Sequence, residues 1–596
     1  MTETLDPYDV SLALRATGLL RELNRPDVLT AADIHVATRL GELGDEDDER
    51  VLLAAALAVR GVRHGSVCVD LDDVRRLAPD ASWPDPAAWV AAVQSSPLVG
   101  TGRPLRRDGD LLYLERYWRQ EDQVCRDLLA REAQPEPAID VDRLSAALAR
   151  LFPGEADDQR LAAVVAATRW TTVLGGGPGT GKTTTVARLL GLLLDQPGPA
   201  LRVALAAPTG KAAARLQEAV QGVAAGFGQA DRDRLGTLTA STLHRLLGSF
   251  PGRGTRFRHD RDNRLPYDVV VVDETSMVSL TLMARLIEAV RPDARLVLVG
   301  DPDQLASVEA GAVLADLVAG LTTRAGVGAA TVGTVTGLVP SAAAASDGWQ
   351  HGVVLLGRTW RFGGAIAELA TNVRDGDPDA AFATLTGGTS DVSFTSDGVR
   401  EDVVGAAAAV RAAAEQGDPA GSLRLMERHR LLCAHRSGPY GVDVWSREIE
   451  RWLADERAGP PEGEWYVGRP LLVTANDYAL SLFNGDTGVV VRAPDGGVRV
   501  AFPREQGAVT FAPSRLADVQ TMHAMTVHRS QGSQFTRVTL VLPDEDSPLL
   551  TRELLYTALT RAQEHVRVVG TEAAFRAAVA RPAARASGLR ERLAGR

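Results

Sequence analysis

The spacing of apolar positions changes along the chain and divides it into an N-terminal part and a larger remainder. Up to about residue 130, Leu, Ala and Arg recur at helical spacing, and the acidic run 45–49 precedes the apolar stretch 51–59. Acidic residues suit a helix N-terminus, so we expect a helix to begin there. The pattern predicts a helical domain over residues 1–130, and the prolines of segment 131–138 predict a linker.

From residue 139 onwards, short β-branched runs alternate with helical stretches. The runs are 171–174, 203–206, 269–272 and 296–299. Continuous apolar strands separated by helices predict a buried parallel sheet, here in an α/β domain over 139–350. Within it, Arg-rich segment 250–265 is either a small hairpin insert or a solvated loop. Segment 320–350, rich in small residues, is expected to be a loose surface insertion.

A second α/β pattern occupies residues 351–596. Segment 465–520 differs from its surroundings, because short strands, Gly- and Asp-containing turns and alternating valines such as Val489 and Val491 predict a small β-barrel-like insert. The helical pattern returns near Leu554.

Composition and charge exclude several classes of protein. The 596 residues are 45% hydrophobic and 24% charged, which is ordinary for globular domains and excludes disorder of the whole chain. The net charge of -11 disfavours a purely electrostatic nucleic-acid binder, although a local groove can still be basic. The acidic N-terminus has no apolar signal core, so we expect a cytoplasmic protein without a membrane segment.

Cysteine and lysine are both rare. Cys68, Cys125 and Cys433 are too few and too widely spaced for a disulfide framework or a four-cysteine metal site, and we expect buried thiols. Of the 65 basic residues, only Lys182 and Lys211 are lysines. They mark positions where a compact ammonium is required in place of a planar guanidinium.

The first lysine lies in a phosphate-binding motif. Residues 176–183 fit G-x-x-x-x-G-K-[ST], and they follow a predicted strand and precede the helical run 184–194. The glycines let backbone N–H groups turn toward phosphates, and the helix presents its positive end. Lys182 is expected to reach the β- and γ-phosphates, and the Thr183 hydroxyl to bind Mg²⁺.

A second motif supplies carboxylates for hydrolysis. The valine run 269–272 ends in Asp273 and Glu274. Asp273 is expected to hold Mg²⁺ through water, and Glu274 to orient and deprotonate the attacking water. Together the two motifs predict an NTPase that uses Mg²⁺, without showing what the energy drives.

Further motifs decide that question. They are A-P-T-G-K-A-A at 207–213, S-T-L-H at 241–244, G-D-P-D-Q-L at 300–305, T-W-R-F at 359–362, T-V-H-R-S-Q-G-S-Q-F at 526–535 and Y-T-A-L-T-R-A at 556–562. With them, the chain from about residue 150 resembles superfamily 1 helicases, and within these the RecD family, the alpha subunit of exonuclease V. The N-terminal stretch, including 64–68, also resembles that family. The resemblance implies an α/β fold with two RecA-like P-loop NTPase domains with parallel sheets, a helical N-terminal domain and a small SH3-like β insert.

The resemblance also implies roles for single residues. Gln159 would read adenine, Trp360 would stack on the base in place of the usual tyrosine, and Arg561 would act as an arginine finger. The implied catalytic residues are Lys182, Asp273, Glu274, Gln304, Arg361 and Arg561. The implied ATP-binding residues are Gln159, Gly176, Gly177, Pro178, Gly179, Thr180, Gly181, Lys182, Thr183, Trp360 and Gln534. Because Gln534 replaces a usual glutamate, a weaker acceptor predicts lower nucleotide affinity.

Contacts to a single DNA strand are implied as well. The residues are Thr209, Lys211, Thr242, His244, Thr526 and His528. Thr242 and Thr526 have an alternative interpretation as helix caps.

The resemblance implies that the chain is an ATP-dependent 5′–3′ translocase and helicase that acts on DNA ends. It would work in a heterotrimer with a beta and a gamma subunit. Both lysines have other roles, so a lysine-dependent nuclease site is expected in the beta subunit, while the N-terminal domain would dock on gamma. The alternatives are a stand-alone superfamily 1B helicase, an ATPase-silent scaffold, and a P-loop ATPase that acts on protein or RNA. The scaffold is disfavoured by four intact residues: Lys182, Asp273, Glu274 and Arg561.

Overall fold

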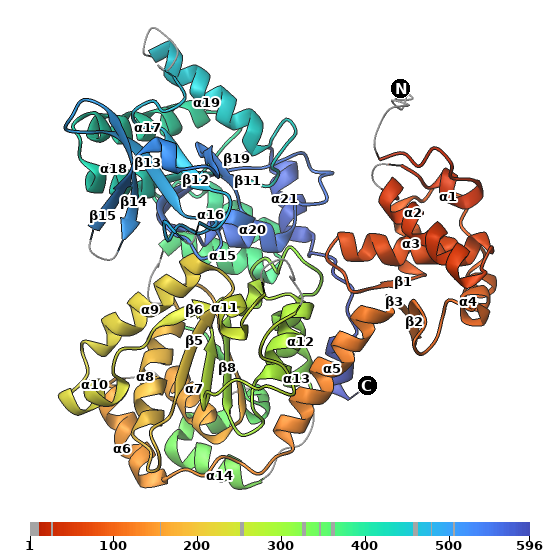
Figure 1. The fold of residues 1–596 in the computed structure, drawn as a ribbon, viewed down its shortest axis with the longest axis horizontal. Helices are drawn as coiled ribbons and strands as arrows, with labels where there is room; N and C mark the ends of the chain where they lie inside the picture. The colour runs from red at the N-terminus through yellow and green to blue at the C-terminus, as the bar shows by residue number, and fades with distance from the viewer. Residues whose placement is uncertain are drawn as a thin grey trace.

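The computed structural model describes residues 11–25, 28–154, 157–250, 256–324, 329–344, 347–358, 364–456, 463–477, 479–504 and 507–595. Two α/β lobes are stacked on each other, and a smaller module stands beside them (Figure 1). We call these parts the N-terminal module (11–114), the first lobe (140–356) and the second lobe (364–580).

The N-terminal module combines helices with a small sheet. Its helices are α1 (Gly18–Glu22), α2 (Ala31–Gly44), α3 (Glu49–Arg63) and α4 (Pro86–Ser95). Strands β1 (Cys68–Asp70), β2 (Leu105–Asp108) and β3 (Leu111–Leu114) form an antiparallel sheet in the order β1-β3-β2. The predicted helical domain is confirmed, and the small sheet is an addition that the sequence did not reveal, because these strands are too short to produce a clear alternating pattern.

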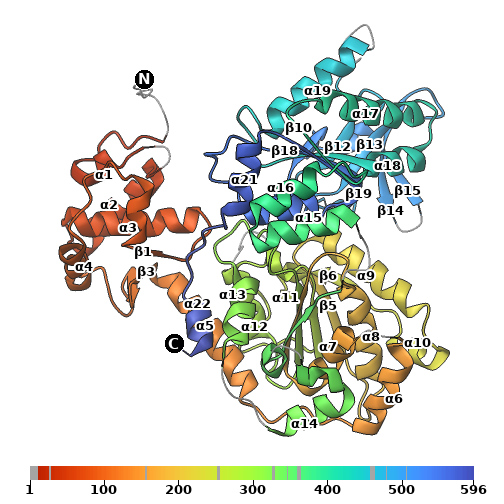
Figure 2. The same cartoon turned by 180° about the vertical axis from the view of Figure 1, so that it is seen from behind.

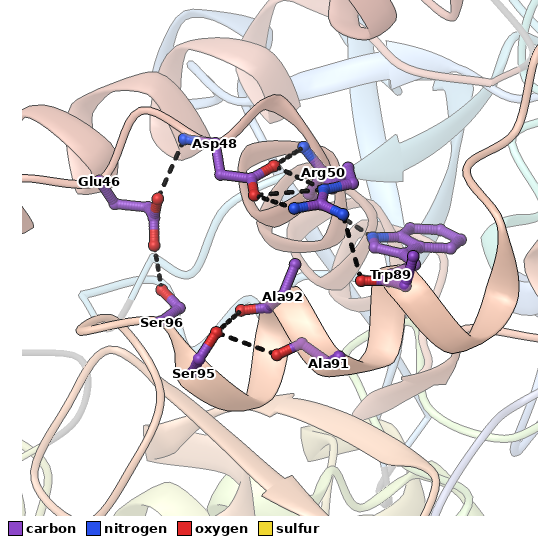
Figure 3. Close-up of polar contacts among 9 residues, drawn as sticks. Glu46, Asp48, Arg50, Trp89, Ala91, Ala92, Ser95 and Ser96 are labelled. Carbon is purple, nitrogen blue, oxygen red and sulfur yellow. Dashed lines mark hydrogen bonds and ion pairs between the residues drawn. The ribbon is translucent and has the colours of Figure 1, made fainter.

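The acidic run does begin a helix, as predicted. Asp48 caps α3 by accepting a 2.9 Å hydrogen bond from the backbone N–H of Arg50, and its carboxylate also pairs with the Arg50 guanidinium (Figure 3). The Trp89 indole donates to the Arg50 carbonyl at 2.7 Å. Glu46 accepts a hydrogen bond from Ser96, so the run fastens α3 to the segment around α4.

Helix α5 (Glu115–Glu132) joins the module to the first lobe and packs along α12 (Leu280–Ala289). Near its end Arg131 is buried and donates to the carbonyl oxygens of Trp170 and Arg291, each at 2.8 Å. The helix ends at Glu132, inside the predicted linker.

The first lobe has a six-stranded parallel sheet, ordered β6-β5-β7-β8-β4-β9. Its strands are β4 (Thr171–Gly176), β5 (Val203–Ala207), β6 (Ala240–Thr242), β7 (Val269–Val272), β8 (Arg295–Gly300) and β9 (Val353–Leu356). The other helices are α6 (Val141–Leu151), α7 (Asp157–Thr168), α8 (Lys182–Leu194), α9 (Gly210–Ala224), α10 (Gln229–Leu235), α11 (Leu243–Leu247), α13 (Val313–Thr322) and α14 (Ala329–Leu338). The four predicted strands and their parallel arrangement are confirmed.

Two expectations for this lobe need correction. Strand β9 pairs with β4, so the first lobe continues past the predicted boundary at 350. Segment 320–350 is not a loose insertion, because Val335, Val339 and Trp349 are buried in the lobe's core. These few large side chains are separated by small ones, which hides the helical spacing. Of the predicted hairpin at 250–265, residues 251–255 lie outside the described residues, and Ser249 and Phe257 form an isolated antiparallel bridge.

The second lobe also has a parallel sheet, ordered β10-β19-β18-β11-β17. Its strands are β10 (Val392–Thr395), β11 (His429–Cys433), β17 (Ala524–Thr526), β18 (Phe535–Val541) and β19 (Ala562–Val569). Its helices are α15 (Gly364–Asp375), α16 (Pro378–Thr386), α17 (Val399–Glu415), α18 (Pro419–Arg428), α19 (Val442–Glu456), α20 (Arg552–Leu559) and α21 (Glu572–Ala580).

The predicted β insert is present in this lobe as a five-stranded antiparallel sheet, ordered β15-β14-β13-β12-β16. The strands are β12 (Pro470–Val473), β13 (Thr487–Arg492), β14 (Val498–Arg504), β15 (Gly507–Phe511) and β16 (Val519–Thr521). Its SH3-like character remains a prediction.

The last residues, 581–595, leave the second lobe, and we call them the C-terminal strap. Within the strap, α22 (Leu589–Ala594) packs against α13 and lies beside α5 (Figure 2). Val67 of the module donates to the carbonyl of Ala586 at 3.0 Å, and Arg592 pairs with Asp108 at 2.7 Å. The predicted domain 351–596 therefore ends before the strap.

Two simpler expectations concern thiols and membranes. Cys68, Cys125 and Cys433 are buried and free, as predicted. In the part of the chain that the structure describes, helices long and apolar enough to span a bilayer do not occur.

Candidate nucleotide cleft and nucleic-acid groove

The phosphate-binding motif forms the loop between β4 and α8. Gly176 and Gly181 have positive φ values of 148° and 88°, and a Cβ on Gly176 would lie 2.8 Å from the carbonyl oxygen of Leu356. Glycine is therefore required where the loop turns beside β9. Lys182 begins α8, and its ammonium donates to the carbonyls of Gly176 and Gly177 at 2.5 and 2.9 Å, so it lies over the loop.

The two carboxylates follow β7, which is separated by β8 from β4, the strand that precedes the loop. Glu274 has φ 51° and ψ 41°, a left-handed conformation that is uncommon for a residue other than glycine and that clusters at functional sites. Burial raises the pKa of Asp273 to about 7, and the charge of Glu274 contributes in the same direction. Lys182 acts in the opposite direction.

A cleft of about 460 Å³ lies between the lobes in front of this loop. The first lobe contributes Lys182, Thr183, Asp273, Glu274 and Gln304 to its lining, and the second lobe contributes residues 532–534 and Arg561. A hydroxyl and a carboxylate are the hard oxygen donors that suit Mg²⁺, which keeps waters and phosphate oxygens as its other ligands. The described residues contain no cluster of three or more His, Cys, Asp or Glu side chains able to hold a metal alone. The residues present therefore fit a magnesium-bound triphosphate.

Hydrogen bonds cross from lobe to lobe at the back of the cleft. The buried Arg561 donates to Oε1 of Gln304 at 3.0 Å, and Gln304 donates to Asp301 at 2.8 Å. Tyr556 of the second lobe also donates to Asp301, at 3.2 Å. Gln304 and Arg561, two of the catalytic residues that the resemblance implies, thus meet. A third, Arg361, lies with Trp360 outside the described residues.

Two predicted glutamines have different positions. Gln159 is buried behind the loop, donates to the carbonyl of Thr180 at 3.4 Å and accepts from Arg188 at 3.3 Å. Gln534 lines the cleft and accepts a 3.4 Å hydrogen bond from Gln563.

Sequence reasoning missed Arg215. It extends from α9 of the first lobe into the cleft lining, and its guanidinium donates to the carbonyl of Gly532 in the second lobe. The available signal was its helical spacing of four residues from Lys211, which places both side chains on one face of α9.

A groove of about 670 Å³ spans another part of the lobe boundary. Of the predicted DNA contacts, Thr209 and His244 of the first lobe and His528 of the second lobe line it. The His244 ring lies 5.8 Å from that of Phe257, which also lines the groove. Burial lowers the pKa of His528, so this ring is neutral at pH 7.

The remaining predicted contacts lie outside the groove lining. Thr242 accepts from the backbone N–H of Arg245 at 3.2 Å and Thr526 from that of Arg529 at 3.3 Å, which is the capping geometry of the alternative interpretation. A capping hydroxyl still has its proton to donate. Lys211 is half-buried and lies toward the second lobe, where desolvation, with Arg215 and Arg430, lowers its pKa to about 8.

A narrow seam separates the cleft from the groove. The backbone N–H of Leu305 donates to the Thr557 hydroxyl at 2.8 Å, and Gln531 donates to the Leu305 carbonyl at 2.7 Å. Gln304 lines the cleft and Gln531 lines the groove. One short first-lobe segment therefore contacts the second lobe between the two sites.

Comparisons with known proteins agree with this arrangement. Three family models match: RecBCD enzyme subunit RecD, N-terminal domain, at residues 25–113; an AAA domain at 159–310; and a UvrD-like helicase C-terminal domain at 521–569. The chain is 56% identical over 579 residues to RecBCD enzyme subunit RecD of Mycolicibacterium smegmatis, covering 95% of this chain and 98% of the relative. It is 54% identical to the protein of that name from Mycobacterium tuberculosis, covering 98% of each. The ATP-dependent RecD2 DNA helicase of Deinococcus radiodurans is 35% identical, over 71% of this chain and 50% of its own length.

Proposed function

Because this chain belongs to the RecD family, we propose that it is the ATP-dependent DNA helicase subunit of a RecBCD-type exodeoxyribonuclease V. It translocates 5′ to 3′ along a single strand and acts at double-strand break ends. The observation that carries the proposal is the hydrogen bond between Arg561 and Gln304, which joins the two lobes directly in front of the phosphate loop.

The chain's own residues account for coupling of ATP hydrolysis to lobe movement. ATP would supply the triphosphate, and Mg²⁺, which Thr183 and Asp273 would hold, would neutralise charge on its phosphates. Lys182 leaves the loop carbonyls to bind the terminal phosphates, and Glu274 orients a water and accepts its proton. Arg561 exchanges Gln304 for the γ-phosphate, so the lobe contact depends on the nucleotide.

Other residues of the proposed ATP site keep the roles that the resemblance implies. Gln159 reads adenine from behind the loop, and Trp360 and Arg361 complete the base and γ-phosphate contacts. Gln534 accepts from the ribose hydroxyl.

The groove is the proposed track for DNA. Thr209, His244 and His528 contact the strand there, with Thr242 and Thr526 at its border. Lys211 is kept as a proposed contact that requires the lobes to part, because its side chain is half-buried near Arg430 of the second lobe.

Partner subunits complete the proposed enzyme. We propose that the beta subunit carries the nuclease, that the N-terminal module docks on the gamma subunit, and that the assembly works in the cytoplasm. The relatives' name, RecBCD enzyme subunit RecD, supports this assignment.

A test begins with ATP hydrolysis by the full chain with and without an unstructured oligonucleotide. We expect strong stimulation by single-stranded DNA and no hydrolysis by Lys182→Gln. A duplex with one 5′ tail should be unwound, and unwinding only from 3′ tails would refute the polarity. Equal hydrolysis with and without DNA, alone and in a complex purified from native extract, would refute the motor.

A further inference from the structure

The groove has a third wall that neither lobe supplies. Arg116 and Tyr117, from the first turn of α5, and Val62, from α3 of the N-terminal module, line it together with the lobe residues. The module has so far been assigned only to subunit docking. Resting on the proposed function, we propose that the start of α5 binds the single strand directly, with the Tyr117 ring stacking on a base and Arg116 binding a phosphate.

The chemistry of the groove fits a single strand at this wall. Tyr117, Phe257 and the two histidines present rings, while Arg116 and Arg529 are exposed cations. Among the described residues of the lining, Glu309 is the one that is acidic. Rings for bases beside cations for the backbone are the combination by which proteins bind single strands without regard to sequence.

Part of the Tyr117 ring packs against the hydrophobic core, while the polar groups of both side chains remain available. Tyr117 is half-buried and Arg116 is exposed, with the guanidinium carbon 5.7 Å from the centre of the Tyr117 ring. Within the described ranges, neither the Tyr117 hydroxyl nor the Arg116 guanidinium makes a hydrogen bond or an ion pair. An arginine beside an aromatic ring can bind a phosphate while the ring stacks on the adjoining base.

The wall is also rigidly fixed to the first lobe. One turn after Tyr117, Gln120 accepts from the hydroxyl of Thr281, itself a groove residue, at 2.9 Å. Gln123 donates to Glu288 at 3.0 Å, and buried Arg131 anchors the far end of the helix. A platform held in place before the strand arrives loses little freedom on binding.

The test measures binding of a fluorescent oligothymidine to the full chain by anisotropy at several salt concentrations. Tyr117→Leu, which keeps apolar packing, should weaken binding about fivefold or more, and Tyr117→Phe should stay within about twofold of the unchanged chain. Arg116→Ala should lower the slope of log affinity against log salt by about 0.7, the value for one phosphate on a single strand.

The matched control is Arg126→Ala. Arg126 lies on the same helix, is largely exposed and, among the residues that the structure describes, pairs with Asp122 alone. The charge change is therefore the same at a position outside the groove. It should leave affinity and salt slope unchanged. If Tyr117→Leu and Arg116→Ala both match Arg126→Ala while all bind DNA tightly, the inference is wrong and the proposed function stands.

Failure of the unchanged chain and of Arg126→Ala to bind DNA would instead count against both. Photocrosslinking gives a second measurement that does not depend on a variant's fold. A 4-thiothymidine oligonucleotide should label the peptide that contains Tyr117 and not the one that contains Arg126. Labelling confined to the lobes would overturn the inference.

Discussion

The cleft and the groove cross the same boundary between the lobes, yet they are built differently. The cleft has a polar lining, and hydrogen bonds such as the one from Arg561 to Gln304 cross it from lobe to lobe. The groove has rings and exposed cations in its lining, and its third wall comes from α5. A nucleotide in the cleft must replace hydrogen bonds between the lobes. A DNA strand in the groove would instead add contacts to the rings and cations of the lining. The difference suits a site that switches and a site that slides.

The largest expected effect would come from the cleft. Arg561→Ala should lower kcat for ATP hydrolysis by about 10³-fold or more, because it removes the proposed arginine finger. Affinity for single-stranded DNA should change less than about twofold. Steady-state hydrolysis at saturating DNA and anisotropy measure the two quantities. A parallel loss of DNA binding would show that the two sites are not separable.

The reciprocal change is in the groove. His244→Ala should raise the dissociation constant for single-stranded DNA about fivefold or more, because it removes a ring from the stacking surface. At saturating DNA, kcat should remain within about twofold of the unchanged chain. Titrating hydrolysis against oligonucleotide separates the two parameters, and a fall in kcat alone would contradict the proposed division.

A smaller effect is expected at the seam between the two sites. Thr557→Val keeps the shape but leaves the buried Leu305 N–H without an acceptor, at a cost of about 1–3 kcal/mol. We expect the stimulation of hydrolysis by DNA to fall roughly fivefold, with basal hydrolysis and DNA affinity little changed. Thr557→Ser retains the hydroxyl and is the control. If DNA stimulated hydrolysis equally in both variants, the hydrogen bond at the seam would not be what couples the groove to the cleft.

The smallest effect is expected far from both sites, where α13 packs against α22 of the C-terminal strap. Burial raises the pKa of Asp316 on α13 to about 7, with Glu121 and Glu591 adding to the shift and Ser587 and Arg590 opposing it. A carboxyl whose pKa is raised on folding costs stability as pH rises from about 4 to 7. Asp316→Asn should therefore stabilise the chain by roughly 1 kcal/mol at pH 8, after allowance for solvent screening, and by nothing near pH 4.

Thermal midpoints at the two pH values measure this difference. The kcat for hydrolysis and the affinity for DNA should equal those of the unchanged chain at pH 8. A change in either quantity would mean that the contact between α13 and α22 is coupled to the cleft or to the groove.

Sequence reasoning reached the cleft more completely than the groove, and the reason is physical. Phosphates are bound by consecutive backbone groups, so the loop at 176–183 can be recognised as a continuous sequence motif. The position of Asp273 follows from the predicted strand that it ends. A groove wall depends on how separate elements pack. Tyr117 stands far from His528 in the chain, and only the packing of α5 on α12 brings them to one lining.

The same distinction explains the errors in the fold. The long apolar runs of the first sheet were predictable, whereas β9 joins that sheet through pairing that its own residues do not specify. Trp349 is buried because small neighbours permit close packing, although their composition is typical of a surface loop. The three short strands of the N-terminal module gave no usable alternation.

The C-terminal strap limits how far the two lobes can separate during a cycle of ATP hydrolysis. Arg581 is fixed to the second lobe through the carbonyl of Ser547 at 2.8 Å, and Arg585 is fixed to the first lobe through that of Ser307 at 2.5 Å. Four backbone steps join these anchors, and at about 3.6 Å each they can extend to roughly 14 Å. The strap therefore restricts separation of the two lobes at this edge, so any larger opening between them must occur at the opposite edge.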